Sequence, residues 1–550
     1  MDGLMMNYPL TLVHLLERVN QLFGKVEVVS REPDQSIHRY TYADFYRRAR
    51  RLAGALSKAG LRRGDRVATL MCNHYPHLEA YFGIPACGGV VHTLNLRLHP
   101  DELAYIANHS GDRMLIVDDV LLPLLEKFRA RAPFERVFVV SKQNAQLTSE
   151  GFEDYEQFLA QDQSNFVYPE LGENEAAAMC YTSGTTGKPK GVLYSHRALV
   201  LHSFAFALPD AFSVAQKDVL MPLAPMFHAN SHGIPYVAVM LGTKLVMPGP
   251  FTDGCSLLDL FESEKVTVTT AVPTVWHGIL EALQKHPGRW KLAPDLRGLS
   301  GGAAAPESLL RGLDRHGVHL LQLWGMTETT PAATVARLKS YMQDLPEAEH
   351  YATRCRQGWT LPFVDMRAAG PEGVAPWDGE TVGELQVRGP WVAASYYNMP
   401  QEARRWTEDG WFCTGDVCTI DAEGFMKIVD RTKDMIKSGG EWISSVDLES
   451  ALMDHPAIRE AAVVAVSHPK WDERPLALII CKDGHQVSAA ELCQFLLLKF
   501  SKWQLPDNFV FVDQLPHTST GKLLKSKLRE QYKEWKWENA GLVEKKNTLI

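Results

Sequence analysis

The sequence lacks three features that would each point to a particular class of protein. There is no C-x-x-C pair among its nine cysteines, and an odd number argues against a disulfide framework. There is no run of about 18 uninterrupted apolar residues, so no transmembrane segment is expected. Basic residues are not in excess, since 57 lysines and arginines stand against 65 aspartates and glutamates, so no nucleic-acid partner is expected. The cysteine pattern fits a reducing compartment, and the expected location is the cytoplasm.

The start of the chain also lacks a basic region and a small-residue cleavage site, which favours a mature helix start over a targeting peptide. With 550 residues the chain exceeds what one hydrophobic core usually serves. We therefore expect two or more domains.

Strands and helices alternate from about residue 40 onward. Short apolar runs such as RVATLM and VVHTLN are separated by helical stretches such as HYPHLEAYFGIPACG. Such alternation predicts a parallel sheet covered on both faces, with ligands at the carboxyl ends of its strands. Beyond about residue 432 the pattern changes to a smaller α+β unit, in which Ser488 and Glu491 are predicted to form a capping box.

The run YTSGTTGKPKGV at 181–192 is the strongest local signal. Its glycines let backbone N–H groups point into one concavity, while hydroxyls and lysines add donors and positive charge, so it predicts a phosphate-binding loop. A Walker A loop does not fit, because only two residues separate the first two glycines and Pro189 follows Lys188. Proline favours a strand after the loop, and Ser195 is then expected to cap the next helix. A plain Gly/Ser/Thr linker is the alternative.

With the later motifs, this loop resembles the signature of the adenylate-forming superfamily, which includes acyl-CoA synthetases, luciferase and the adenylation domains of peptide synthetases. The later motifs are LLQLWGMTETTP, WFCTGD, KSGGEWISS and LPHTSTGKLLKSKLRE. Together with PMFH and KWDERPL, they look most like bacterial medium- and long-chain fatty acyl-CoA ligases and 3-(methylthio)propionyl-CoA ligases.

The resemblance implies an α/β fold in two parts. A large N-terminal domain of parallel α/β sheets, residues 1–431, is expected to hold the ATP and acyl sites. A small mobile C-terminal α+β domain, residues 432–550, is expected to carry the catalytic lysine and the coenzyme A face. Lys433 falls at the hinge between them.

The resemblance also implies the nucleotide-binding residues. Those expected to hold the phosphates of ATP are Thr182, Ser183, Gly184, Thr185, Thr186, Gly187 and Lys188. Those expected around adenine, phosphate and ribose are Gly302, Ala303, Trp324, Gly325, Thr327, Asp416 and Arg431. Ordinary structural roles are the alternatives: tryptophan is often a core anchor, and Thr-Gly-Asp forms a good turn by itself. Pro306, after the glycines at 301 and 302, is predicted at the first position of a helix.

For metal binding and catalysis, the resemblance implies that Glu328 and Thr185 hold Mg²⁺ and that Lys522 stabilises the reacting phosphate. Mg²⁺ takes one or two carboxylates plus phosphate oxygens, which fits Glu328. The alternative for Lys522 is a solvated basic helix start.

PMFH resembles the motif in which an aromatic residue and a histidine, here His228, line the acyl pocket near the reacting carboxylate. The i,i+4 pair of His228 and His232 could suit a metal, but no carboxylate accompanies it. Fatty-acid-activating relatives often carry tryptophan where this chain has His232, so the shape and polarity of the acyl entrance are expected to differ. On the small domain, the expected coenzyme A residues are Lys437, Gly439, Gly440 and Trp442.

The implied reaction is that of an ATP-dependent acyl-CoA ligase. A carboxylic acid, ATP and CoA would give acyl-CoA, AMP and diphosphate through an acyl-adenylate, with medium- or long-chain fatty acids as substrates. The alternatives are a short acid such as 3-(methylthio)propionate, or an acceptor other than CoA. A non-catalytic nucleotide-binding protein is disfavoured because Lys522 and Glu328 are both present. Relatives suggest a homodimer, by analogy alone.

Overall fold

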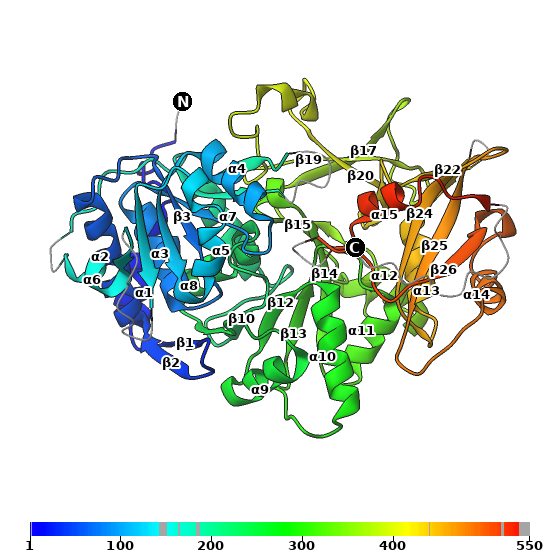
Figure 1. Cartoon of the computed structure of the whole chain (residues 1–550), viewed down its shortest axis with the longest axis horizontal. Helices are drawn as coiled ribbons and strands as arrows, with labels where there is room; N and C mark the ends of the chain where they lie inside the picture. The colour runs from blue at the N-terminus through cyan, green and yellow to red at the C-terminus, as the bar shows by residue number, and fades with distance from the viewer. Residues whose placement is uncertain are drawn as a thin grey trace.

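The protein is described here by a computed structural model, which covers residues 1, 3–141, 151–162, 166–182, 188–438, 441–518 and 522–537. Within these residues the strands form four sheets. Figure 1 shows the N-terminal sheets at the left and centre and the C-terminal unit, orange to red, at the right. The mixed α/β architecture with a separate small C-terminal unit is the predicted fold.

The first sheet has seven strands, and all of its pairings are parallel except the last, between β8 and β9. Across the sheet, its strands are β7 (Glu153–Asp154), β6 (Arg136–Val140), β5 (Asp112–Asp118), β3 (Arg66–Leu70), β4 (Val90–Thr93), β8 (Ala176–Tyr181) and β9 (Gly191–Ser195). The predicted phosphate loop therefore joins two antiparallel strands, and a strand follows it as predicted.

The second sheet has nine strands and is parallel from β14 to β1, with antiparallel strands at both edges. In order they are β16 (Trp359–Thr360), β15 (Ala332–Val335), β14 (His319–Gly325), β13 (Arg297–Ser300), β12 (Val268–Ala271), β10 (Val219–Pro222), β11 (Lys244–Met247), β1 (Glu27–Arg31) and β2 (Ile37–Thr41). Several predicted site residues lie at or just beyond the carboxyl ends of β10, β13 and β14.

Helices cover these two sheets. They are α1 (Leu12–Phe23), α2 (Tyr42–Lys58), α3 (Tyr75–Ala86), α4 (Pro100–Ser110), α5 (Leu122–Glu126), α6 (Tyr155–Ala160), α7 (His196–Ala207), α8 (Ile234–Leu241), α9 (Gly254–Glu264), α10 (Pro273–Lys285), α11 (Glu307–Asp314) and α12 (Glu347–Arg354). Ser195 caps α7 by accepting the Ala198 N–H, as predicted. Pro306 stands at the N-cap of α11, one residue before its predicted first-turn position.

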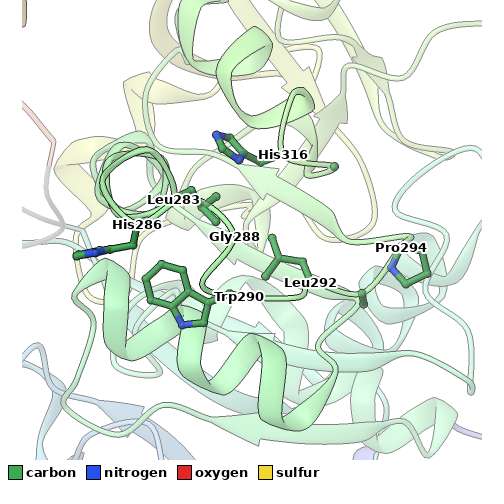
Figure 2. Close-up of a pocket in the computed structure, with 9 residues that line it drawn as sticks. Leu283, His286, Gly288, Trp290, Leu292, Pro294 and His316 are labelled. Carbon is green, nitrogen blue, oxygen red and sulfur yellow. The ribbon is translucent and has the colours of Figure 1, made fainter.

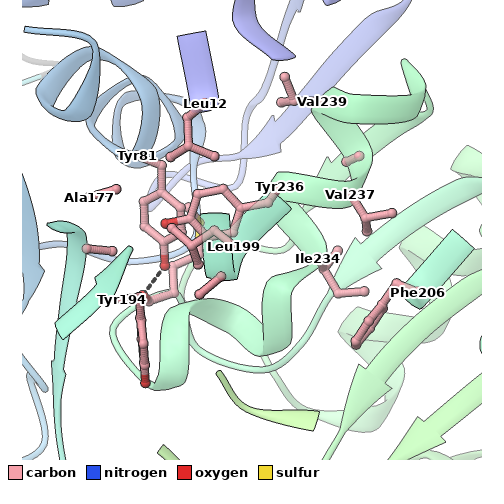
Figure 3. Close-up of a cluster of buried hydrophobic side chains, with 14 of the residues drawn as sticks. Leu12, Tyr81, Ala177, Tyr194, Leu199, Phe206, Ile234, Tyr236, Val237 and Val239 are labelled. Atoms are coloured by element: carbon pink, nitrogen blue, oxygen red, sulfur yellow. Dashed lines mark hydrogen bonds between the residues drawn. The ribbon is translucent and has the colours of Figure 1, made fainter. Parts of the chain in front are cut away.

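The largest apolar core lies where four of these helices meet. Figure 3 shows Leu12, Tyr81, Leu199 and Tyr236, which come from α1, α3, α7 and α8 and are all buried. Burying apolar surface stabilises the fold by about 25 cal/mol per Å². This shared core fixes the two N-terminal sheets relative to each other.

Two further sheets complete the chain. The antiparallel third sheet contains β18 (Gly373–Val374), β17 (Asp365–Gly370), β19 (Gly383–Arg388), β20 (Phe412–Ile420) and β21 (Met426–Arg431). The C-terminal unit contains β23 (Glu441–Ile443), β22 (Ile436–Ser438), β25 (Asp472–Cys481), β24 (Ile458–His468), β26 (Asn508–Phe511), α13 (Ser445–Met453), α14 (Ala489–Leu496) and α15 (Lys525–Gln531). Ser488 caps α14 by accepting the N–H of Glu491.

Within the described chain, no helix is long and apolar enough to cross a membrane.

Candidate active site

The predicted phosphate loop is closed at its base by two hydrogen bonds. The Thr182 N–H donates to the Lys190 carbonyl (2.9 Å), and the Lys190 N–H donates to Thr182 Oγ1 (3.1 Å). Of the two lysines, Lys190 donates to Glu402 (2.6 Å), whereas Lys188 Nζ lies 5.1 Å from the ring centre of Tyr105. Within the described chain, Lys190 is therefore paired with a carboxylate, whereas Lys188 has no carboxylate contact. The predicted residues outside the described chain are Ser183, Gly184, Thr185, Thr186, Gly187, Gly439 and Gly440.

Trp324, Asp416 and Arg431 come together although they belong to three different strands. The Trp324 indole N–H donates to Asp416 Oδ2 (2.8 Å), and Arg431 Nε pairs with Asp416 Oδ1 (3.0 Å). Trp324 is only 7% exposed and also packs into the core, so it serves as an anchor as well. The two predicted ribose residues thus form one charged pair held beside the indole.

Glu328 lies in the short turn η4 (Thr327–Thr329), directly after β14. Its buried carboxylate accepts a hydrogen bond from Tyr396, and the Thr327 carbonyl accepts one from Tyr194 (2.7 Å). A side chain at Gly325 would meet the Pro331 carbonyl at 1.7 Å, so glycine is required at this close approach. Sequence reasoning missed Tyr396, whose only signal was an aromatic pair after β19.

The donor set around Glu328 fits a magnesium ion bound partly by substrate. A carboxylate oxygen is the ligand that Mg²⁺ prefers, together with phosphate oxygens and water. The described residues contain no group of three His, Cys, Asp or Glu side chains that could hold a metal by themselves. An ion here would therefore depend on the nucleotide phosphates for its other ligands.

Lys522 reaches the N-terminal part from the C-terminal unit. A Cβ atom on Gly302 would lie 3.1 Å from Lys522 Cε, so glycine leaves room for this side chain. The pKa of Lys522 is lowered to about 8, first by burial and then by the Arg431 charge, while Asp416 and Glu328 oppose the shift. The structure therefore gathers Lys522, Gly302, Arg431, Asp416 and Glu328 in one place. Ala303 follows directly in the chain.

The PMFH turn is held by Asn73, which sequence reasoning also missed. Asn73 Nδ2 donates to the carbonyls of Pro222 (2.9 Å) and Ala224 (3.1 Å), and its Oδ1 accepts the Met226 N–H (2.7 Å). His228 follows this turn, and its pKa is lowered to about 3, first by burial and then by the charge of Lys522. A neutral imidazole is thus placed near the lysine.

Changing Asn73 to aspartate is expected to lower the free energy of unfolding by about 1–3 kcal/mol, because a carboxylate oxygen would then face the Pro222 and Ala224 carbonyl oxygens in place of the amide N–H groups that donate to them. Urea denaturation followed by tryptophan fluorescence measures this loss. An unchanged midpoint and slope would show that the turn does not depend on these hydrogen bonds.

Two of the predicted coenzyme A residues, Lys437 and Trp442, lie on the paired strands β22 and β23. Lys437 Nζ is 5.8 Å from the ring centre of Trp442, and Trp442 is 54% exposed. The Lys437 N–H donates to Glu473 (2.9 Å). These paired strands present a tryptophan face to solvent.

The junction between the two parts carries a buried polar network. Asp430 Oδ2 accepts both the backbone N–H (2.7 Å) and the hydroxyl (2.5 Å) of Ser445. Lys525 donates to the same Ser445 hydroxyl (2.6 Å) and pairs with Glu449 (2.8 Å). Lys433 follows this network, and its pKa is lowered by partial burial and by neighbouring cations, Arg405 first. In this structure α15, and with it Lys522, is therefore tied to the end of β21.

The surface cavity in Figure 2 is separate from these residues. It measures about 190 Å³ and is lined by His286 and Trp290, at the end of α10 and in the loop after it, and by His316, just after α11. None of the predicted site residues lines it.

Two comparisons concern the sequence. The family described as AMP-binding enzyme matches residues 16–397, and the AMP-binding enzyme C-terminal domain matches residues 447–522. The long-chain-fatty-acid–CoA ligase of Thermus thermophilus is 48% identical over 96% of this chain and 97% of that protein. The medium-chain-fatty-acid–CoA ligase of Ectopseudomonas oleovorans is 42% identical over 97% of this chain and 98% of that protein. The 3-methylmercaptopropionyl-CoA ligase of Ruegeria pomeroyi is 42% identical over 97% and 99%.

A comparison with solved structures agrees. The anthranilate CoA ligase AuaEII in complex with anthranoyl-AMP superposes with a TM-score of 0.85 and 25% identity, covering 96% of this chain and 98% of that one.

Proposed function

Because this chain belongs to the AMP-binding enzyme family, we propose that it is an AMP-forming ligase that joins a carboxylic acid to coenzyme A at the expense of ATP. The observation that carries the proposal is the position of Lys522. It comes from the C-terminal unit, yet its side chain lies against Gly302 and shares its surroundings with Arg431, Asp416 and Glu328. A cation placed among nucleotide-binding residues serves phosphate chemistry.

In the first half-reaction, a carboxylate oxygen attacks the α-phosphorus of ATP, the bond to the β-phosphate oxygen breaks, and diphosphate leaves. Asp416 would accept hydrogen bonds from the ribose hydroxyls. Lys188 and Thr182 would bind phosphate. Lys522 would stabilise the negative charge that grows on the phosphoryl oxygens. Mg²⁺, bound through Glu328 and phosphate oxygens, would supply further positive charge there.

In the second half-reaction, the CoA thiolate attacks the acyl carbonyl, and AMP leaves with the electrons of the acyl–oxygen bond. For this step we propose that the small domain, from about residue 432, turns about Lys433 and presents Lys437 and Trp442. The exposed Trp442 and the junction at β21 support this placement. One domain would thus serve both half-reactions.

The acid is proposed to be a medium- or long-chain fatty acid, supported by the two fatty-acid ligases among the relatives. The second candidate is a short acid such as 3-(methylthio)propionate, which the Ruegeria relative and the polar His232 favour. A homodimer and a cytoplasmic location stay predictions.

Mass spectrometry of CoA thioesters tests the proposal, with ATP, Mg²⁺, CoA and acids from propionate and 3-(methylthio)propionate through octanoate to palmitate. We expect thioester and AMP to appear together, with a maximum at eight carbons or more. A maximum at the short acids would favour the second candidate, and AMP formation without thioester would overturn the choice of CoA as acceptor.

The pH dependence follows from Lys522. Because its pKa is lowered to about 8, the amine is charged below that pH and loses its charge above it. We therefore expect kcat/KM for ATP, measured by diphosphate release, to fall as pH rises through about 8. Lys522→Arg should move this fall to higher pH, since guanidinium keeps its proton. A profile that falls at the same pH in both proteins would assign the limb to another group.

A further inference from the structure

His232 has a ring nitrogen without a hydrogen-bond partner. The side chain is 8% exposed, and its Nδ1 atom is buried and unpaired within the described chain. A buried polar atom left unpaired costs free energy, so most such atoms have partners in folded proteins. Near the proposed adenylation lysine, a bound substrate can supply the missing partner.

The backbone around His232 is held in a rare conformation. Three non-glycine residues of the turn η3 (Ala229–Gly233) have left-handed φ angles, namely Ala229 (36°), Ser231 (56°) and His232 (54°). Such strain persists only where the surroundings impose it, and it gathers at functional sites. Here the Ser231 hydroxyl donates to the Ala224 carbonyl (2.8 Å), whose other hydrogen bond comes from Asn73. These hydrogen bonds hold the turn in this backbone conformation.

The neighbours of His232 show which end of a substrate it would meet. Its pKa is lowered to about 4, first by burial and then by the charge of Lys522, so the ring is neutral and lies near Lys522, the proposed adenylation lysine. His202, on α7, is a second neutral imidazole, because burial first and the charge of His232 second lower its pKa to about 3. Its Nε2 accepts the Ala332 N–H (3.2 Å), so its own proton is on Nδ1. The two histidine side chains here are therefore polar but uncharged.

We propose that His232 makes this enzyme select acids with a hydrogen-bonding substituent, such as a hydroxyl, on one of the first carbons after the carboxylate. The inference rests on the proposed ligase function and deepens it. A plain alkyl chain would cover Nδ1 without forming a hydrogen bond to it. A hydroxyl can donate a hydrogen bond to an imidazole nitrogen or accept one from it. A site that pairs a substrate hydroxyl discriminates against the analogue that lacks it.

The test compares kcat/KM for hexanoate with those for 2-, 3- and 4-hydroxyhexanoate, measured as thioester formed by the full chain. We expect at least one hydroxy acid to exceed hexanoate about tenfold or more. His232→Phe should reverse that preference. His232→Asn should keep it, because the asparagine amide lies where Nδ1 lay and asparagine tolerates a left-handed φ. His316→Phe, beside the surface cavity, is the matched control and should leave the ratio unchanged.

Thermal melting checks that each variant is folded, and His232→Gly replaces the phenylalanine variant if that one does not fold, since glycine accepts the same φ. Preference for hexanoate over all three hydroxy acids in the unmodified enzyme would overturn the inference while leaving the ligase function intact. So would a ratio that His232→Phe does not change. Failure to convert any acid of the wider panel would instead overturn the ligase proposal itself.

Discussion

Replacing Lys522 by alanine is expected to slow adenylate formation by about a hundredfold to a thousandfold, the usual effect of removing one preorganised charge at a transition state. The side chain lies against Gly302 and is close enough to Arg431, Asp416 and Glu328 for their charges to shift its pKa. Diphosphate release in the absence of CoA measures this half-reaction directly.

Measuring the second half-reaction in the same variant shows whether a loss of activity comes from catalysis or from loss of the fold. Thioester formation from pre-made acyl-adenylate and CoA should survive in Lys522→Ala, because that step does not need the charge on the phosphoryl group. Lys527→Ala is the matched control, since Lys527 lies exposed on α15, the helix that follows Lys522 in the chain. Equal losses in both half-reactions would contradict the assignment of Lys522 to adenylation.

Replacing Glu328 by glutamine is expected to lower the rate of adenylate formation about a hundredfold and to raise the Mg²⁺ concentration that gives half of the maximal rate. Glutamine keeps the size of the side chain and can still accept the Tyr396 hydrogen bond, but it loses the anionic ligand. Diphosphate release across a range of Mg²⁺ concentrations measures both quantities.

Tyr396→Phe tests whether Glu328 acts through the metal or through its hydrogen bond with Tyr396. It removes the hydroxyl and keeps the Glu328 carboxylate, so its Mg²⁺ dependence should stay near that of the unmodified enzyme. If Glu328→Gln keeps the same half-saturating Mg²⁺ concentration, Glu328 serves the fold of the turn rather than the metal.

Local pattern predicted the elements of this protein well. Alternating apolar runs located β3 and β4, and Pro189 correctly indicated a strand, β9, after the phosphate loop. These signals are short-range, since they depend on periodicity and on the backbone limits of proline. The one-residue error at Pro306 is also local, because proline is accepted both before and within a first helical turn.

The contacts that build the site could not be predicted in this way. Asn73 holds a turn about 150 residues further along the chain, and Tyr396 contacts Glu328 across 68 residues. Neither residue has a local pattern that distinguishes it from an ordinary polar or aromatic residue. The family resemblance proposed Trp324, Asp416 and Lys522, whereas their mutual contacts required the fold.

The late position of Lys522 in the chain has a consequence for biosynthesis. Domains fold largely in the order in which the ribosome makes them, so the two large sheets can form while the C-terminal unit is still being synthesised. Glu328 and Asp416 would then already be in place, but Lys522 arrives only with the last folded elements. An incomplete chain that ends before residue 522 would therefore lack the charge that we propose for adenylate formation.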